Sequence, residues 1–151
     1  MKVRYLVAIF LTFIILSVVN VFGQTTYYYD GSGNLHDRTN WGPNTNGSGT
    51  DPANFTANNQ IFEIRNTISV SVTNNWTVSG TGSKIVIGNS GVAAITVSHT
   101  GGDWNATVDI AAASSGTNIL DFQETDTRTP TLGTLNSAST VSYTRAGTQT
   151  V

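Results

Sequence analysis

Carboxylates are the residues of this chain best suited to acid–base chemistry. The second half of the sequence contains a series of aspartates with strand-sized segments between them: Asp103, Asp109, Asp121 and Asp126. If successive coils of a repetitive fold placed them on one face, paired carboxylates there would suit a polysaccharide lyase or a glycosidase. No cluster of lysine or arginine accompanies them. We therefore interpret them as solvated side chains at coil edges and expect no catalytic residue.

A second group of oxygen ligands lies in the segment 30–34, where Asp30, Ser32 and Asn34 alternate with glycine. This spacing is typical of the opening of a calcium-binding loop. The EF-hand pattern fails, because Leu35 stands where glycine is required and no glutamate closes the loop. A plain turn is the favoured interpretation, and structural calcium held by Asp30, Ser32 and Asn34 is the alternative. No other metal or cofactor is expected.

Nucleophilic and zinc chemistry have little support. The sequence has two histidines, His36 and His99, and no cysteine, so it offers neither a His-x-x-x-His pair nor a thiolate. His36 stands beside Asp37, but a histidine next to an aspartate in a turn is more often a solvated contact than a proton-transfer pair. No Gly-x-Ser-x-Gly elbow occurs. These features favour a protein that is not an enzyme.

Three tryptophans, Trp41, Trp76 and Trp104, offer aromatic faces on which sugar rings could stack. Trp76 and Trp104 follow turn residues and start strands, which makes them the candidates for glycan contact. The competing interpretation is packing: Trp41 would anchor a loop and the other two would cover coil corners. We favour packing.

The elements that must position these residues are short strands. Charged residues are 11% of the chain, and 7 basic against 9 acidic side chains give a net charge of −2, so the basic stripe that nucleic-acid binding requires is missing. Residues that favour strands and turns dominate. Predicted strands cover 25–29, 61–64, 68–72, 76–78, 84–87, 95–97, 106–110, 118–122 and 140–143.

Two all-β folds fit this pattern. Residues 82–87 are echoed by 116–122 and more faintly by 139–143, as expected when each coil of a solenoid is one repeating unit. A β-sandwich also makes strands at this density. We favour the solenoid, a right-handed parallel β-helix, because hairpin dipeptides such as Asn-Gly are missing after residue 60.

Residues 1–23 have the parts of a secretory signal peptide. Lys2 and Arg4 precede an apolar run, and Gly23 stands before the polar Gln24. We expect a helix that is cleaved after Gly23 and that provides the only membrane contact; a permanent anchor is the alternative. The absence of cysteine suits a large bacterial surface protein. The predicted location is extracellular or on the outer cell surface, reached through the periplasm.

The exported part divides into two predicted units. Residues 24–66 form a strand and a capping loop, in which Trp41 and Phe55 pack over the first coil and residues 61–64 are that coil's first strand. Residues 67–151 form the coils. The last residues look like the opening of another strand without a polar cap, so we expect the sequence to be the front of a longer solenoid.

Several of these residues carry a family resemblance. Asn40-Trp41-Gly42, Thr45-Asn46-Gly47 and Gly49-Thr50-Asp51-Pro52, followed by Phe55, Asn59, Phe62, Ile64 and Asn66, and the stretch WTVSGTGSKIVIGN at 76–89, resemble the start of secreted surface proteins of gliding Gram-negative bacteria. The resemblance implies a β-helical, adhesin-like protein exported by the type IX pathway. The C-terminal sorting domain of such proteins is not in this sequence.

The function predicted from these observations is structural or adhesive. A cell-surface protein of this kind would bind surface glycans or other cell-surface proteins by avidity across its repeats. Two alternatives remain open: the N-terminal part of a β-helical polysaccharide-degrading enzyme, and a carbohydrate-binding module. Nucleic acid is not an expected partner.

Overall fold

The computed structural model describes residues 23–124 and 129–145. The predicted signal peptide, except for Gly23, and Asp126 therefore lie outside the described residues. In the described residues almost all of the regular structure is β, with one short 3-10 helix, η1 (Arg38–Asn40). The strands are β1 (Thr25–Tyr29), β2 (Trp41–Gly42), β3 (Gln60–Ile64), β4 (Ser69–Val72), β5 (Trp76–Thr77), β6 (Lys84–Ile87), β7 (Thr96–His99), β8 (Trp104–Asn105), β9 (Thr107–Ile110), β10 (Ile119–Phe122), β11 (Thr131–Leu135) and β12 (Thr140–Tyr143).

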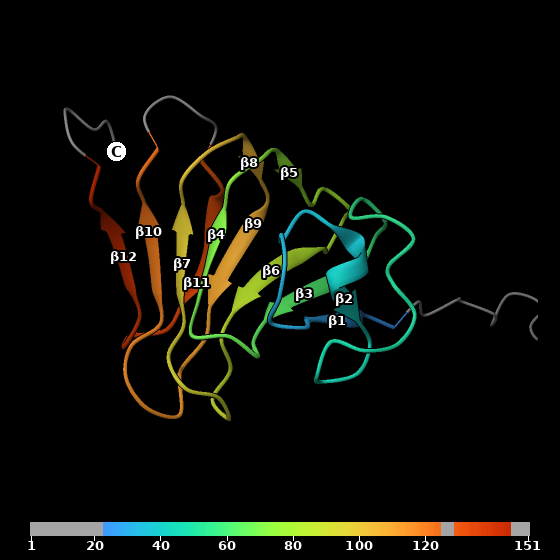
Figure 1. The fold of residues 1–151 in the computed structure, drawn as a ribbon, viewed down its shortest axis with the longest axis horizontal. Helices are drawn as coiled ribbons and strands as arrows, with labels where there is room; N and C mark the ends of the chain where they lie inside the picture. Colours follow the sequence, from blue (N-terminus) through green and yellow to red (C-terminus); the bar gives the residue numbers. More distant parts are fainter. Residues whose placement is uncertain (1–22, 125–128, 146–151) are drawn as a thin grey trace, which may run out of the picture.

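The strands stack as a parallel β-solenoid, which confirms the fold favoured from the sequence over the sandwich (Figure 1). We call the sheet with the order β11-β9-β6-β3-β1-β2 sheet A and the sheet with the order β12-β10-β7-β4 sheet B. The pair β5-β8 forms a third, two-stranded sheet. Every pairing among β3 to β12 in the described residues is parallel, whereas β1 and β2 are antiparallel.

The register of sheet A shows the repeat length. Ile61 pairs with Lys84, and Ile85 pairs with Val108, so each of these rungs lies 23 residues after the previous one. In sheet B, Ile119 pairs with Thr140, as the echo of 116–122 in 139–143 predicted. The other predicted echo is wrong, because 82–87 contributes to sheet A whereas 116–122 contributes to sheet B. Strand β11 was not predicted from the sequence.

Inward-pointing side chains form columns that run along the solenoid. Phe62, Ile85 and Val108 follow one another in sheet A and are all fully buried. In sheet B, Val97 and Leu120 are likewise buried and are direct register partners. Burying a side chain of this size contributes roughly 1.5–3 kcal/mol, so the columns are the main source of stability in a chain with few charges and no cysteine.

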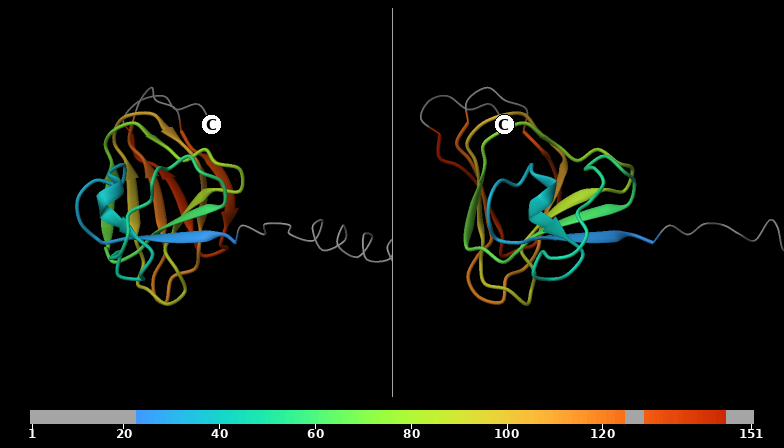
Figure 2. Two further views of the ribbon diagram at one scale, coloured as in Figure 1. Left: turned by 90° about the vertical axis from the view of Figure 1, so that its right-hand side faces the viewer. Right: turned by 45° about the vertical axis from the view of Figure 1, so that its right-hand side comes forward.

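The segment between β1 and β3 packs against one end of the coils. Trp41 contacts Phe55 and Phe62 with ring centroids 6.4 and 5.4 Å apart, and Phe55 lies 5.0 Å from Phe62. Asn66, at a positive φ of 62°, donates from Nδ2 to the carbonyl oxygens of Tyr29 and Thr45 and so ties the loop to the first coil. Figure 2 shows this segment, blue to cyan, in front of the coils when the N-terminal side faces the viewer.

Strand β1 extends the solenoid sheet into this covering segment. Thr26 and Tyr27 pair in parallel with Ile61 and Phe62, so β1 acts as one more rung of sheet A. Sheet A thus runs continuously from the predicted capping unit into the predicted coils, across residue 66. Within residues 23–124 and 129–145, no helix has the length and apolar character needed to cross a bilayer.

Candidate functional site

The tryptophans form a buried column. The rings of Trp41 and Trp76 lie 5.7 Å apart, and those of Trp76 and Trp104 are stacked at 5.9 Å with an interplanar angle of 14°. The exposed fractions of the three residues are 0%, 2% and 0%. The glycan-contact role considered for Trp76 and Trp104 is therefore wrong for this structure, since no ring face is open to a sugar. Both residues fill coil corners, which is the packing role favoured from the sequence.

The glycine-rich turn at 30–34 is held by its own hydrogen bonds. Asp30 Oδ1 accepts from the backbone N–H and the hydroxyl of Ser32, at 2.8 and 3.1 Å. The carbonyl oxygen of Asn34 accepts from Asn40 Nδ2 at 2.9 Å. Asp30, Ser32 and Asn34 thus form the turn that the sequence favoured, and calcium binding there stays a prediction. The described residues contain no group of three or more His, Cys, Asp or Glu side chains arranged to hold a metal.

The coil aspartates within the described residues do not line up on one face. Asp109 belongs to β9 of sheet A, whereas Asp121 belongs to β10 of sheet B. Asp109 accepts from Lys84 Nζ at 2.6 Å and from the backbone N–H of Thr134 at 2.7 Å. Both carboxylates are largely buried, with exposed fractions of 9% and 7%, which corrects the interpretation of Asp109 and Asp121 as solvated edge residues. Asp103 is exposed and precedes β8.

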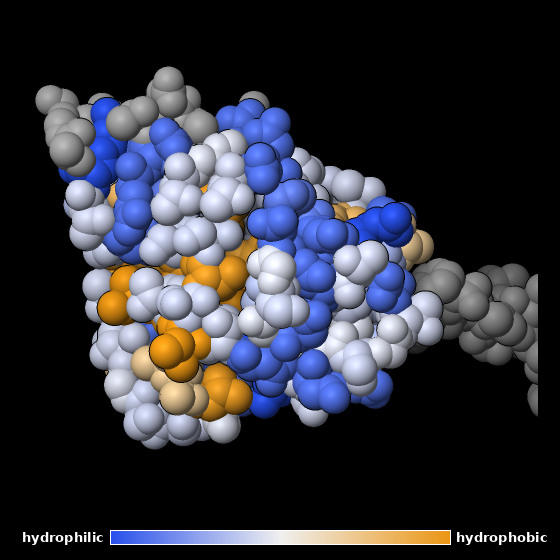
Figure 3. All heavy atoms as spheres, in the orientation of Figure 1, coloured by the Kyte–Doolittle hydropathy of each residue, from blue (hydrophilic) through white to orange (hydrophobic). Residues whose placement is uncertain are grey.

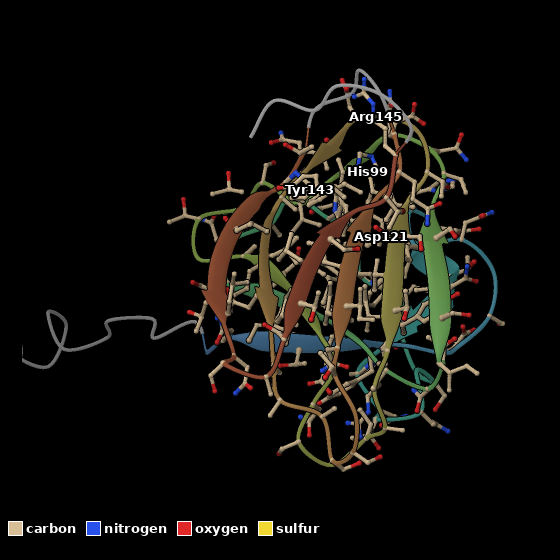
Figure 4. All side chains as sticks on the ribbon, turned by 90° about the vertical axis from the view of Figure 1, so that its left-hand side faces the viewer. His99, Asp121, Tyr143 and Arg145 are labelled. Carbon is tan, nitrogen blue, oxygen red and sulfur yellow. The ribbon has the colours of Figure 1, made fainter. Side chains whose placement is uncertain are left out.

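Neither histidine forms an acid–base pair with a neighbouring aspartate. His99 is the register partner of Val72 and Phe122. Its side chain is completely buried in the core. Its Nε2 lies 2.7 Å from the carbonyl oxygen of Gly102. Asp121 precedes Phe122, the register partner of His99, so the side chains of Asp121 and His99 point to opposite faces of sheet B. The two residues nevertheless lie near each other in the view of Figure 4. Asp37, beside His36, instead caps η1 by accepting from Thr39 N–H.

Asp121 is the centre of a hydrogen-bond network on the outer face of sheet B. Its Oδ1 accepts from the Ser142 hydroxyl at 2.5 Å, and its Oδ2 accepts from Gln123 Nε2 at 2.6 Å and from the Thr144 hydroxyl at 2.8 Å. Burial raises the pKa of Asp121, but these hydrogen bonds, together with one from the Thr144 backbone, outweigh it and hold the pKa below its ordinary value. The ionised carboxylate therefore links the last two rungs of sheet B.

The outer face of sheet B carries rows of hydroxyl groups, and we call it the hydroxyl face. One row contains Ser69, Thr96, Ile119 and Thr140, and the next contains Ser71, Ser98, Asp121 and Ser142. Neighbouring strands are about 4.8 Å apart, and alternate residues of one strand are about 6.7 Å apart, so the hydroxyl groups of β4 and β7 form a regular grid. Ile119 and Asp121 of β10 interrupt the grid before it continues in β12. Such a grid can offer repeated hydrogen bonds, and Asp121 is the one charged side chain in these two rows.

Sheet A has a different outer face. There the row Tyr28, Glu63, Val86 and Asp109 mixes aromatic, charged and apolar side chains. Arg65 lies 3.4 Å from Glu63 and stacks over Tyr28 at 5.4 Å from the ring centroid. Burial raises the pKa of Glu63 above its ordinary value, against the opposing effects of Arg65 and Asn89. The hydroxyl face is thus specific to sheet B.

Sequence reasoning missed the hydroxyl face and the Asp121 network, although it predicted a strand over 68–72. The signal that could have found them is the spacing of 21 residues from Asp121 to Ser142 and of 23 from Ser98 to Asp121. No protein-family model, curated protein or solved structure matches the chain. The hydroxyl face is therefore the candidate site, and its assignment rests on geometry.

Proposed function

We propose that this chain belongs to an exported, adhesin-like surface protein without catalytic activity, and that the hydroxyl face is its binding surface. The observation that carries the proposal is the grid of serine and threonine hydroxyls on sheet B. Hydroxyl groups donate and accept hydrogen bonds, as the hydroxyls of glycans do, so the preferred partner is a surface glycan; another cell-surface protein is the second choice.

Binding to such a face depends on many weak contacts. Strands β4, β7 and β12 present hydroxyl groups at the same two positions, and linked weak contacts reach a useful affinity only when several form together. The face has few charges, so binding should change little with salt. On the side of the molecule that Figure 3 shows, most of the surface is pale or blue, and the largest orange patches lie on the half that carries β4, β7, β10 and β12.

The test is a binding measurement on a panel of immobilised polysaccharides at several surface densities. The variant Ser69→Glu/Ser71→Glu places two charges on the exposed start of the hydroxyl face. The matched control, Thr81→Glu/Ser114→Glu, adds the same charge at exposed positions outside sheet B. We expect binding that rises steeply with glycan density, at least about a tenfold loss in the first variant, and little loss in the control.

Binding that both variants weaken equally, or no binding to any glycan or cell-surface preparation, would remove the support for this function. Export is tested separately. N-terminal sequencing of protein recovered outside the cell should begin at Gln24, because Gly23 is the expected cleavage position. Recovery of the whole chain in the cell membrane would instead identify residues 1–23 as an anchor.

A further inference from the structure

The two strands at one end of the solenoid are both edge strands. Strand β11 is the outermost strand of sheet A at that end, and β12 is the outermost strand of sheet B. Figure 1 shows them on the side of the molecule away from β1 and β2. An edge strand presents backbone N–H and C=O groups that another strand can pair with. We call this surface the β11–β12 end.

The inward columns become exposed at the β11–β12 end. Val108 is fully buried, but its register partner Leu132 is 38% exposed. Phe122 is 4% exposed, whereas its register partner Tyr143, which stacks on it at 5.1 Å, is 40% exposed. Leu135, the partner of Ile110, is 41% exposed. The same column positions that earlier rungs bury are therefore left open in both sheets at once.

The opposite end of the solenoid is treated differently. There Phe62, the β3 member of the same column, is fully buried beneath Trp41, Phe55 and Tyr27. The chain thus supplies a cover for one end of its columns, and within the described residues no equivalent cover lies over Leu132 and Tyr143.

The β11–β12 end also has little of the usual protection of an edge. Strands β11 and β12 have the sequences TLGTL and TVSY, which contain no charged residue and no proline. Natural edge strands are often blunted by a lysine, a proline, an inward charge or a bulge, and of these β11 and β12 have only a bulge, between Leu132 and Leu135 of β11. The combination of open backbone, open columns and no charge fits one occupant best, namely a β coil that continues the same columns.

We propose that the β11–β12 end is a docking surface for a further β-solenoid coil. The coil adds one strand in parallel to β11 and one to β12, and it places apolar side chains over Leu132 and Tyr143. This inference is independent of the adhesive function, because it rests on the registers and exposures of the last rung alone.

The chain itself provides a coil for the test. Residues 100–122 contain β8, β9 and β10, so a copy of them supplies a corner, a strand for sheet A and a strand for sheet B in the required order. We would attach this copy after Val151 and measure backbone amide hydrogen exchange in β11 and β12. Exchange should slow about tenfold or more in both strands relative to the unextended chain.

Two controls separate docking from a general effect of the extension. In the first, the copied positions of Val108, Ile110, Leu120 and Phe122 carry serine, and the slower exchange should disappear. In the second, Leu132→Asp in the extended chain should abolish protection of β11, whereas Ile68→Asp, at an apolar side chain that is 76% exposed but outside the last rung, should leave it unchanged.

Unchanged exchange in the extended chain would overturn the proposal, as would equal protection by the serine control. Sedimentation of the unextended chain tests whether a second copy of the chain binds at this end instead. A dimer that Leu132→Asp dissociates would show that a second copy, and not a further coil, occupies the β11–β12 end. A monomer at the same concentration is the expected result.

Discussion

Trp76 and Trp104 are direct register partners whose indole rings stack at 5.9 Å inside the solenoid. They occupy the same corner of successive coils and continue the column that Trp41 begins in the covering segment. The aromatic residues that looked most suited to sugar binding are therefore what joins the cap to the coils.

The first prediction is that Trp104→Ala lowers stability rather than only binding. Removing a buried indole leaves a cavity and should cost about 3–5 kcal/mol, whereas Trp104→Phe should cost less because it keeps an aromatic ring in the column. Urea unfolding followed by circular dichroism measures both. If Trp104→Ala kept the stability of the parent chain, the tryptophan column would not have the structural role described here.

Asp121 should make the last rungs sensitive to acid. Its pKa is lowered in the folded state, so its contribution to stability is complete above the pKa of an unfolded aspartate and is lost as the pH falls through the folded-state pKa. Asp121→Asn should reduce stability at neutral pH and should differ less from the parent chain as the pH decreases. Urea midpoints across the acid range provide the measurement, and a constant difference would contradict this role.

Glu63 should have the opposite effect on how stability changes with pH. Burial raises its pKa in the folded state, so the stability associated with protonated Glu63 is complete below the unfolded pKa and is lost as the pH rises through the raised value. Glu63→Gln should therefore increase stability at neutral pH and lose this advantage in acid. Arg65→Gln serves as the control: it should destabilise the chain, because it leaves the Glu63 carboxylate without its neighbouring charge.

Gly102 should not tolerate a side chain. Its φ is +75°, and a Cβ atom would lie 2.3 Å from the backbone carbon of Asn74 in the preceding coil. Gly102→Ala should lower stability by more than about 1 kcal/mol, since it adds both backbone strain and a steric overlap. Gly91→Ala is the matched control, with a nearest contact of 3.4 Å and no positive φ; thermal unfolding should show little change.

Much of the fold could be predicted because its signals are local. Alternating runs such as 68–72, bounded by Asn and Gly, indicate strands whatever the rest of the chain does. Strand β11 was missed because Gly133 interrupts it and its pairing depends on a bulge where Asp109 accepts from Thr134, a contact between residues 25 positions apart. Such a contact leaves no local pattern.

The repeat and the hydroxyl face were harder to predict from the sequence, because they too depend on contacts between distant residues. Column positions need only an apolar side chain of suitable size, so Phe62, Ile85 and Val108 are equivalent in the structure without being similar in the sequence. The hydroxyl face exists only once the coils are in register, and the burial of Trp76 depends on the distant Trp41. These properties come from the stacking of coils and not from any single segment.

The covered end of the solenoid has a consequence for how the chain would fold. The pairings among β3 to β12 join residues that lie 21 to 28 positions apart, so each rung needs only the rung before it. A chain that left a translocation channel with its N-terminal side first would deliver the cap before any coil. Each later coil would then pair with a coil that is already folded. The stepwise burial of side chains would oppose movement of the chain back into the channel.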